Sequence, residues 1–288
     1  ARLSGNYQLI RASCLIIISS TGRDKPMPDD VPILSQKHYT CPTLFEPSAL
    51  IREARRQKSL ASRDVPAICV LDPDGDLSRH LQHSGAKRHP GWACYHTEMY
   101  ELELDAVTVG VIGCAVGASF AVLIAEQLFV SGCELLISVT SSGQLVKAGN
   151  PPYFILIDKA LRDEGTSYHY LPPSSYAFRP SALNSLADSI STKAPHVIRG
   201  GTWTTDAPYR ETAEAIANAK SLKLLAVEME ASALYAFAEA RDKDVICFAH
   251  VTNRMATVEN DFEKGENAGN TAMVALLKVI AREWRTGE

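Results

Sequence analysis

The sequence lacks a long apolar run, and this absence bears on where the protein can work. The only apolar run near its start covers Cys14 to Ile18, whereas a membrane helix needs about 20 consecutive apolar residues. No convincing small-residue cleavage site follows that run, so a secretory signal is not expected either. We therefore expect no membrane-spanning segment. We interpret residues 1–26 as an N-terminal extension of a single domain that covers residues 27–288.

Paired cysteines are also missing. The seven cysteines are scattered and odd in number, and none has Cys-x-x-Cys spacing. This pattern argues against a disulfide-stapled domain and against a structural zinc site, and it favours reduced thiols in a cytoplasm. We expect no metal ion.

A strong excess of charge of either sign is absent as well. The formal net charge is -4, and the one basic cluster, between Arg52 and Lys58, is interpreted as a solvated helix face. A basic surface for nucleic acid is therefore not expected. The length of 288 residues and the hydrophobic content of 46% allow one large α/β domain or two small ones, with a sizeable core.

Short apolar runs alternate with segments of helical periodicity along the chain. This alternation predicts an α/β domain. The five prolines between residues 26 and 48 predict an irregular arm on the surface. The predicted strands cover residues 66–71, 92–104, 107–113, 134–139, 153–158, 224–229 and 244–251, and the predicted helices cover residues 120–130, 231–240 and 267–284.

Two carboxylates stand two residues apart inside an apolar and small-residue segment, Ala226 to Tyr235. Glu228 and Glu230 lie where a predicted strand passes into a predicted helix, so they can point to different sides of that break. Burying an ionised carboxylate without partners is costly, so at least one of the two should meet a hydrogen-bonding ligand or a cation. A vicinal diol fits this requirement because it offers two O–H donors. The alternative is that both are ordinary acids at a helix N-terminus.

The segment Val-Glu-Met-Glu-Ala-x-Ala-Leu, residues 227–234, resembles the ribose-binding signature of the nucleoside phosphorylase superfamily. Residues 162–169 resemble the Arg-x-Asp-Gly-x-Ser-x-His segment of the same superfamily. The resemblance implies an α/β fold with a single-domain mixed β-sheet flanked by helices. It also implies that Glu230 binds the ribose hydroxyls and that Met229 lines the sugar pocket. His38 is the candidate for a histidine that reaches the ribose 5′-hydroxyl in a neighbouring subunit.

The stretches that resemble the family's phosphate site depart from its pattern. Gly75 and Ser138 stand where the family carries phosphate-binding arginines. The remaining candidates for phosphate binding are Ser141, Gly117 and, as a replacement from nearby, Arg79.

The resemblance also implies a set of base-binding residues: Gly143, Tyr168, His169, Arg210 and Asn253. The Asn253 side chain cannot supply a proton. It therefore favours a base whose departing charge spreads onto carbonyl oxygens, which means a pyrimidine or a 6-oxopurine. The candidate catalytic residues are Glu230, which would fix the ribose, and Asn253 and Arg210, which would stabilise the leaving base.

Three functions stay open at this point. The resemblance favours a phosphorylase that cleaves the N-glycosidic bond of a ribonucleoside, uridine-like or 6-oxopurine, with phosphate as co-substrate and no cofactor. The missing arginines favour a nucleosidase, in which water replaces phosphate. A non-catalytic nucleoside-binding protein would keep Glu230 and Met229. The resemblance further implies a homo-oligomer, either a dimer or a hexamer built as a trimer of dimers.

Overall fold

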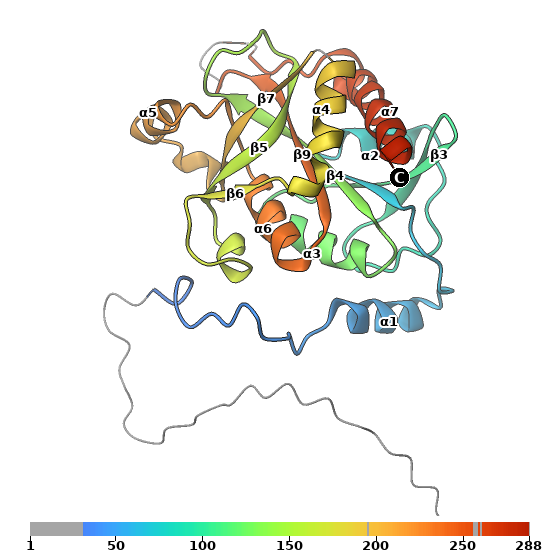
Figure 1. Ribbon diagram of the computed structural model, residues 1–288. Coiled ribbons are helices and arrows are strands. Elements are labelled where there is room, and N and C mark those ends of the chain that lie inside the picture. The colour runs from blue at the N-terminus through green and yellow to red at the C-terminus, as the bar shows by residue number, and fades with distance from the viewer. Residues whose placement is uncertain (1–30, 195, 256–258, 260, 288) are drawn as a thin grey trace, which may run out of the picture.

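The computed structural model describes residues 31–194, 196–255, 259 and 261–287. The expected extension over residues 1–26 lies outside this part of the chain. Residues 31–46 form the predicted irregular arm, which is largely exposed and leads into helix α1, Pro47–Lys58. In Figure 1 the arm and α1, in blue, run along one side of the molecule.

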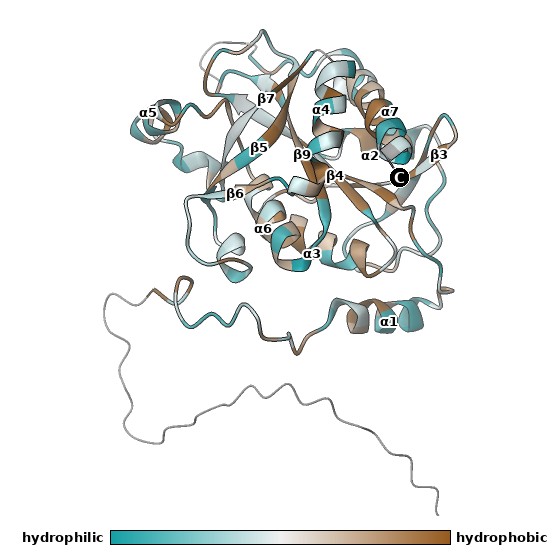
Figure 2. Cartoon of the chain, in the orientation of Figure 1, coloured by the Kyte–Doolittle hydropathy of each residue, from teal (hydrophilic) through white to brown (hydrophobic). Residues whose placement is uncertain are grey.

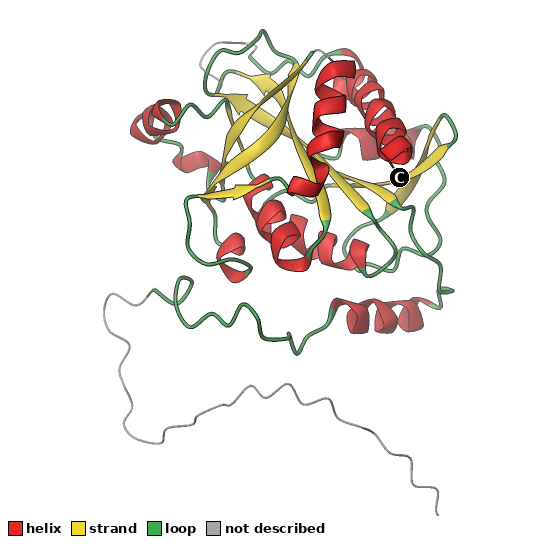
Figure 3. Ribbon diagram, viewed as in Figure 1, coloured by secondary structure: helices red, strands yellow, loops and turns green. Residues whose placement is uncertain are grey.

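Within the described residues, one mixed sheet of nine strands forms the centre of the fold (Figure 3). Its order is β2-β3-β1-β4-β8-β7-β5-β6, and β9 pairs with both β4 and β5. The strands are β1 Ile68–Asp72, β2 Met99–Leu104, β3 Val107–Gly113, β4 Leu135–Gln144, β5 Tyr153–Asp163, β6 Tyr176–Phe178, β7 Val197–Thr205, β8 Ala226–Glu228 and β9 Asp244–Asn253.

Five of the strands close into a ring. β4 pairs with β9 in parallel from Leu135 to Gly143, and the ring continues from β9 to β5, from β5 to β7 and from β7 to β8. β8 returns to β4 where Gly143 and Gln144 pair with Val227 and Ala226. The ring brings the ends of β4, β8 and β9 together. Ligands in α/β folds bind beyond the carboxyl ends of strands, so this junction is the place to look for a site.

Helices cover both faces of the sheet (Figure 1), and a separate cluster of buried apolar side chains fills each interface. One face carries α3 (Ala118–Phe129) and α6 (Ala231–Arg241). The other carries α2 (Asp76–His83), α4 (Asn184–Lys193) and α7 (Asn270–Gly287), while α5 (Ala213–Ser221) lies at the edge. Figure 2 shows the brown of hydrophobic residues along much of β9, as expected for a strand covered on both faces, whereas β4 is apolar mainly in its first half. The short 3-10 helices are η1 Thr166–His169, η2 Ser181–Leu183, η3 Pro208–Arg210 and η4 Glu266–Gly269.

Several of the predicted strand boundaries were wrong, and β5 runs five residues beyond its predicted end, to Asp163. β2 begins at Met99 rather than Trp92, because residues 92–98 form an irregular segment with a bend, in which Trp92 is buried without joining the sheet. The polar residues 140–143, expected beyond the end of a strand, lie inside β4, because their backbone pairs with β9 as far as Asn253. None of the helices in the described part of the chain is both long and apolar enough to span a bilayer.

Candidate active site

A cavity of about 490 Å³ opens where the ends of β4, β8 and β9 meet. Its volume lies in the range of small-molecule sites. The wall includes four residues that the sequence predicted for nucleoside or phosphate binding, Ser141, Gly143, Met229 and Asn253. The other lining residues are Asp74, Ser142, Pro208, Tyr209, Glu211, Val227, Glu228, Thr252, Met255, Phe262 and Lys264.

Glu228, the last residue of β8, is buried and satisfied by four donors. Its Oε1 accepts hydrogen bonds from the hydroxyls of Thr202 at 3.0 Å and Thr204 at 2.5 Å. Its Oε2 accepts from the amides of Glu230 at 2.8 Å and Ala231 at 2.7 Å. Burial raises the pKa of this carboxyl in spite of those donors. Glu228 thus ties β7 to the first turn of α6, which is the structural role that the sequence left open for one of the pair.

Glu230 points to the other side of the break between β8 and α6. Its Oε1 accepts from the Gly117 amide at 2.7 Å, and its Oε2 accepts from the Met229 amide at 3.3 Å. The residue is 1% exposed, and burial, reinforced by the nearby carboxylates of Glu228 and Asp74, raises its pKa to about 8. The side chain is therefore mainly protonated at pH 7 in the free protein. Glu230 is not among the residues that line the cavity, and its Oε1 already accepts a hydrogen bond from the amide of Gly117, a predicted phosphate ligand.

The loop after β1 places a carboxylate beside a predicted phosphate ligand. Asp72 fixes the loop, because its Oδ1 accepts from the Gly75 amide at 3.2 Å and its Oδ2 from the Ser78 amide at 2.9 Å. Burial raises the pKa of Asp72 to about 6. Asp74 reaches across to β4, where its Oδ2 accepts from the Ser141 amide at 2.7 Å. The Ser141 amide, which would be a donor to phosphate, therefore already donates its hydrogen bond to the carboxylate of Asp74.

Arg79, the predicted replacement for a missing arginine, lies just outside the cavity wall. Its guanidinium donates to the Asp76 carboxylate at 3.0 Å and to the Asp74 backbone carbonyl at 2.7 Å. A Cβ built on Gly75 would lie 2.8 Å from the Arg79 Nη1 and 2.4 Å from the Cys114 Sγ. The Arg79 side chain, one helical turn away, thus fills the volume that a side chain at position 75 would need.

Asn253 ends β9 with its carboxamide held in one orientation. The Asn253 Oδ1 accepts from the Met255 amide at 2.9 Å, so the Nδ2 group is left as the donor to a ligand; its contacts with the Ser142 carbonyl and the Thr252 hydroxyl are longer, at 3.4 and 3.2 Å. Gly143 lies directly opposite. A Cβ there would come within 2.3 Å of the Met255 Sδ and 3.3 Å of the Asn253 Oδ1, so a side chain at this position would displace Met255 and press on the Asn253 carboxamide.

Glu211 lines the same cavity just after η3. Its side chain is half-buried, no described residue donates a hydrogen bond to its carboxylate, and burial alone raises its pKa. Arg210, the predicted base ligand next to it, is exposed and is not part of the wall. The segment predicted for base contact therefore reaches the cavity through a carboxylate rather than through a guanidinium.

The cavity wall is acidic. Among the described residues that line it, Asp74, Glu211 and Glu228 are carboxylic acids and Lys264 is the only cation. Lys264 is already paired with Asp76. The described part of the chain also holds no group of three or more His, Cys, Asp or Glu residues placed to bind a metal ion.

The remaining predicted residues gather around η1, apart from this cavity wall. The Lys37 Nζ of the arm lies 3.2 Å from the His169 Nδ1. Tyr168 stacks on Arg162, with the guanidinium carbon 4.3 Å from the ring centre, and donates to the Arg162 carbonyl at 3.1 Å. His38 follows Lys37 and is exposed. The structure thus brings His38, Tyr168 and His169 to one region but puts none of them in the wall that holds Met229 and Asn253.

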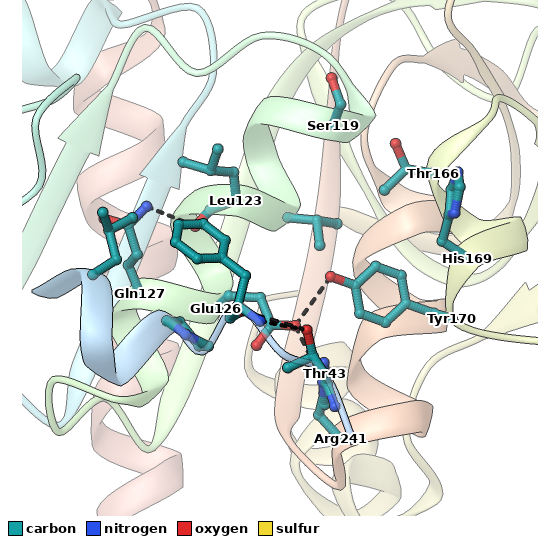
Figure 4. A pocket seen from close by; sticks show the side chains of 13 residues that line it. Thr43, Ser119, Leu123, Glu126, Gln127, Thr166, His169, Tyr170 and Arg241 are labelled. Carbon is teal, nitrogen blue, oxygen red and sulfur yellow. Dashed lines mark hydrogen bonds and ion pairs between the residues drawn. The ribbon is translucent and has the colours of Figure 1, made fainter. Parts of the chain in front are cut away.

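A second cavity of about 490 Å³ lies between the arm, α3, η1 and α6 (Figure 4). His169 and Tyr170 enter it from one side and Leu123 from the other. Glu126 accepts hydrogen bonds from the Tyr170 hydroxyl at 3.0 Å and from the Arg241 Nε at 3.1 Å. The Glu126 carboxylate and the Arg241 guanidinium thus satisfy each other, and the residues predicted for sugar and phosphate binding, Met229 and Ser141, line the first cavity instead.

Three residues of the first cavity were missed from the sequence. Asp74 could have been identified, because residues 72–75 resemble a phosphate-binding loop of the superfamily and a carboxylate in such a loop would repel phosphate. Glu211 had a weaker signal, its place next to Arg210. Lys264 had none, since its pairing with Asp76 joins parts of the chain that are far apart in sequence.

Known proteins share both the sequence pattern and the fold. Residues 67–282 match the sequence profile of the phosphorylase superfamily. The chain is 28% identical over 160 residues to the uncharacterized protein R802 of Acanthamoeba polyphaga mimivirus, a match that covers 56% of this chain and 60% of the viral protein. The chain therefore spans about three fifths of the length of that curated relative.

Several solved structures have the same fold. Uridine phosphorylase from Vibrio fischeri ES114, complexed with 6-hydroxy-1-naphthoic acid, aligns with a TM-score of 0.66 at 17% identity, over 81% of this chain and 99% of that one. Purine nucleoside phosphorylase from Toxoplasma gondii, in complex with immucillin-H, gives 0.64 at 15% identity, over 78% and 95%. AMP nucleosidase from Bacteroides thetaiotaomicron VPI-5482 gives 0.64 at 19% identity, over 85% and 100%. These matches confirm the predicted α/β fold, and because the superfamily profile covers most of the chain, the protein belongs to the phosphorylase superfamily.

Proposed function

We propose that the protein is a nucleosidase, which cleaves the N-glycosidic bond of a ribonucleoside with water. The charge of the cavity wall carries this proposal. Three carboxylic acids and an already paired lysine line the cavity, and no arginine is among its described lining residues. A phosphate dianion needs charge-assisted donors, each worth roughly 1.5–3 kcal/mol. Water needs instead an acceptor for its proton, and the Asp74 carboxylate supplies one.

The ribose is assigned to Met229 and Glu230. Its 2′,3′-diol would take the place of the Gly117 amide, which now donates to the Glu230 Oε1 at 2.7 Å. Two O–H donors stabilise the ionised carboxylate, so binding would lower the pKa of Glu230 from about 8 and release a proton at neutral pH. His38 stays a proposed contact to the 5′-hydroxyl.

The base is assigned to the end of the cavity that holds Gly143, Asn253 and Glu211. The Asn253 Nδ2 donates and the Glu211 carboxylate accepts, which matches a carbonyl oxygen beside an N–H group. Uracil and 6-oxopurines have this edge, whereas adenine presents the reverse pattern. When the bond breaks, the electron pair leaves with the base, and the charge spreads onto the carbonyl oxygen that Asn253 holds. Water adds to the anomeric carbon, and its proton passes through Asp74 to the base.

Phosphorolysis is the second candidate, and one observation favours it. The Arg79 guanidinium fills the volume beside Gly75, where the resembling enzymes carry a phosphate-binding arginine. That guanidinium already contacts the Asp74 loop, and opening its bond to Asp76 would free it to meet a phosphate ion. Tyr168, His169 and Arg210 also remain proposed base contacts, should closure of their loops bring them to the cavity.

A base-release assay with and without phosphate separates the candidates. Purified protein is incubated with uridine, inosine and adenosine, and the sugar product is identified. A nucleosidase yields ribose at a rate that does not depend on phosphate. Formation of ribose 1-phosphate would overturn hydrolysis in favour of phosphorolysis, and saturable binding without base release would identify a nucleoside-binding protein.

We also propose a homo-oligomer that works in a reducing compartment, the cytoplasm. Leu44 and Phe45 of the arm and Val116 and Leu123 near α3 are large apolar side chains with at least 40% of their surface exposed, and such patches mark contact surfaces. No disulfide joins the six cysteines among the described residues. Light scattering after gel filtration tests the assembly, and a monomer at micromolar concentration would refute it.

A further inference from the structure

We propose that Asp74 is an internal anion that excludes phosphate from the active site. This inference rests on the proposed nucleosidase function and names the residue that selects water over phosphate. It starts from one contact: the Asp74 Oδ2 lies 2.7 Å from the Ser141 amide nitrogen, inside the cavity wall.

The position of Asp74 is built into the loop. On one side, Asp72 accepts hydrogen bonds from the amides of Gly75 and Ser78 and holds the turn in place. On the other side, Arg79 donates to the Asp74 backbone carbonyl at 2.7 Å. The backbone of Asp74 is thus fixed from both directions, and its side chain is aimed at Ser141 before any ligand arrives.

Among the described residues, the Asp74 carboxylate also has no ion-pair partner. Asp76, two residues on, is paired with Arg79 and with Lys264. No cation among the described residues pairs with the Asp74 carboxylate, whose one described donor is the Ser141 amide. A phosphate ion that approached this amide would have to displace the carboxylate or lie against it. Repulsion between like charges at that distance weakens phosphate binding by on the order of 100-fold or more.

Three substitutions separate charge from contact. Asp74→Glu keeps the charge, Asp74→Asn removes the charge but keeps an acceptor for the Ser141 amide, and Asp74→Ala removes both. Binding of inorganic phosphate is measured for each protein by calorimetry without nucleoside, in chloride solutions of matched ionic strength. Wild type and Asp74→Glu should show no binding below about 10 mM. Asp74→Asn should gain affinity by at least about tenfold, and Asp74→Ala by on the order of 100-fold, in line with the loss of one close charge.

A matched control tests whether the contact or only the overall charge matters. Glu211→Gln removes one carboxylate from the same wall at its base end, and it should leave phosphate binding as weak as in wild type. Equal gains for Glu211→Gln and Asp74→Asn would overturn the proposal, and so would submillimolar phosphate binding by wild type. If Asp74→Ala does not fold, Asp74→Asn decides, since the absence of any gain there refutes the role of the charge. Phosphate binding needs no turnover, so failure of the proposed hydrolysis would appear separately, in the base-release assay.

Discussion

The burial of Glu230 makes the stability of the protein depend on pH in a way that one substitution should abolish. The pKa of this carboxyl is about 8 in the folded protein and 4.5 in its ordinary state. Because the folded pKa is raised, the folded state keeps a proton that the unfolded chain releases. The stabilisation is fully present below pH 4.5 and is lost as the pH rises towards 8. Between pH 5 and pH 8 this one group should lower the free energy of unfolding by roughly 3 to 4 kcal/mol.

Glu230→Gln retains the shape of the side chain and removes this titration. Urea unfolding of both proteins at pH 5, 6, 7 and 8 gives the free energy of unfolding, and the difference between variant and wild type should grow steadily in favour of the variant as the pH rises. Glu283→Gln is the control. Hydrogen bonds from Lys193 and Ser189 outweigh the effect of burial at Glu283 and lower its pKa to about 2, so that substitution should barely alter the slope in this range. Parallel curves for wild type and Glu230→Gln would refute the assignment of a buried, protonated Glu230.

Three further predictions concern the same site. Ribonucleoside binding at pH 7 should release a proton, visible as a binding enthalpy that changes with the ionisation enthalpy of the buffer, and a 2′,3′-dideoxynucleoside should release none. Glu211→Gln should reduce the preference for inosine or uridine over adenosine by roughly 1–3 kcal/mol in relative kcat/KM, since it exchanges a lone acceptor for a group that also donates; an unchanged preference would remove Glu211 from base recognition. Thr204→Val should lower the free energy of unfolding by roughly 1–3 kcal/mol, because Glu228 loses a donor and the Ser232 amide loses its acceptor; a loss below about 0.5 kcal/mol in urea unfolding would contradict that.

The central strands and the break between two glutamates were predictable from the sequence, and their physical cause is local. β1, β3 and β9 are nearly continuous apolar runs, because helices cover both of their faces. The separation of Glu228 from Glu230 follows from a strand that ends where a helix begins, and the structure puts their carboxyl groups on Thr204 and on Gly117 respectively.

Long-range pairing explains what the sequence did not show. Asp74 and Ser141 are 67 residues apart in the sequence, and Asp76 and Lys264 are 188 residues apart. Contacts at such separations cannot be recognised from a local sequence pattern. The predicted end of β4 was too early for the same reason. The hydroxyl-bearing residues 140–142 favour a loop by their type, and only the pairing with β9 makes them part of the strand. The turn at η3 decides whether Arg210 or Glu211 faces the cavity. The residue types in this segment do not by themselves determine how that turn is oriented.

The closed ring of strands also sets an order of events during synthesis. β1, β3 and β4 can assemble as soon as residues 68–144 have emerged, but the second edge of β4 has no partner until β9 arrives about 100 residues later. Contacts of such sequence separation form late and slowly. Until then Ser141 and Gly143 lie on an open strand edge, and Asn253 has not been made. The cavity is therefore among the last parts of the molecule to form, and a chain cut before residue 244 would carry the Val-Glu-Met-Glu segment at 227–230 without it.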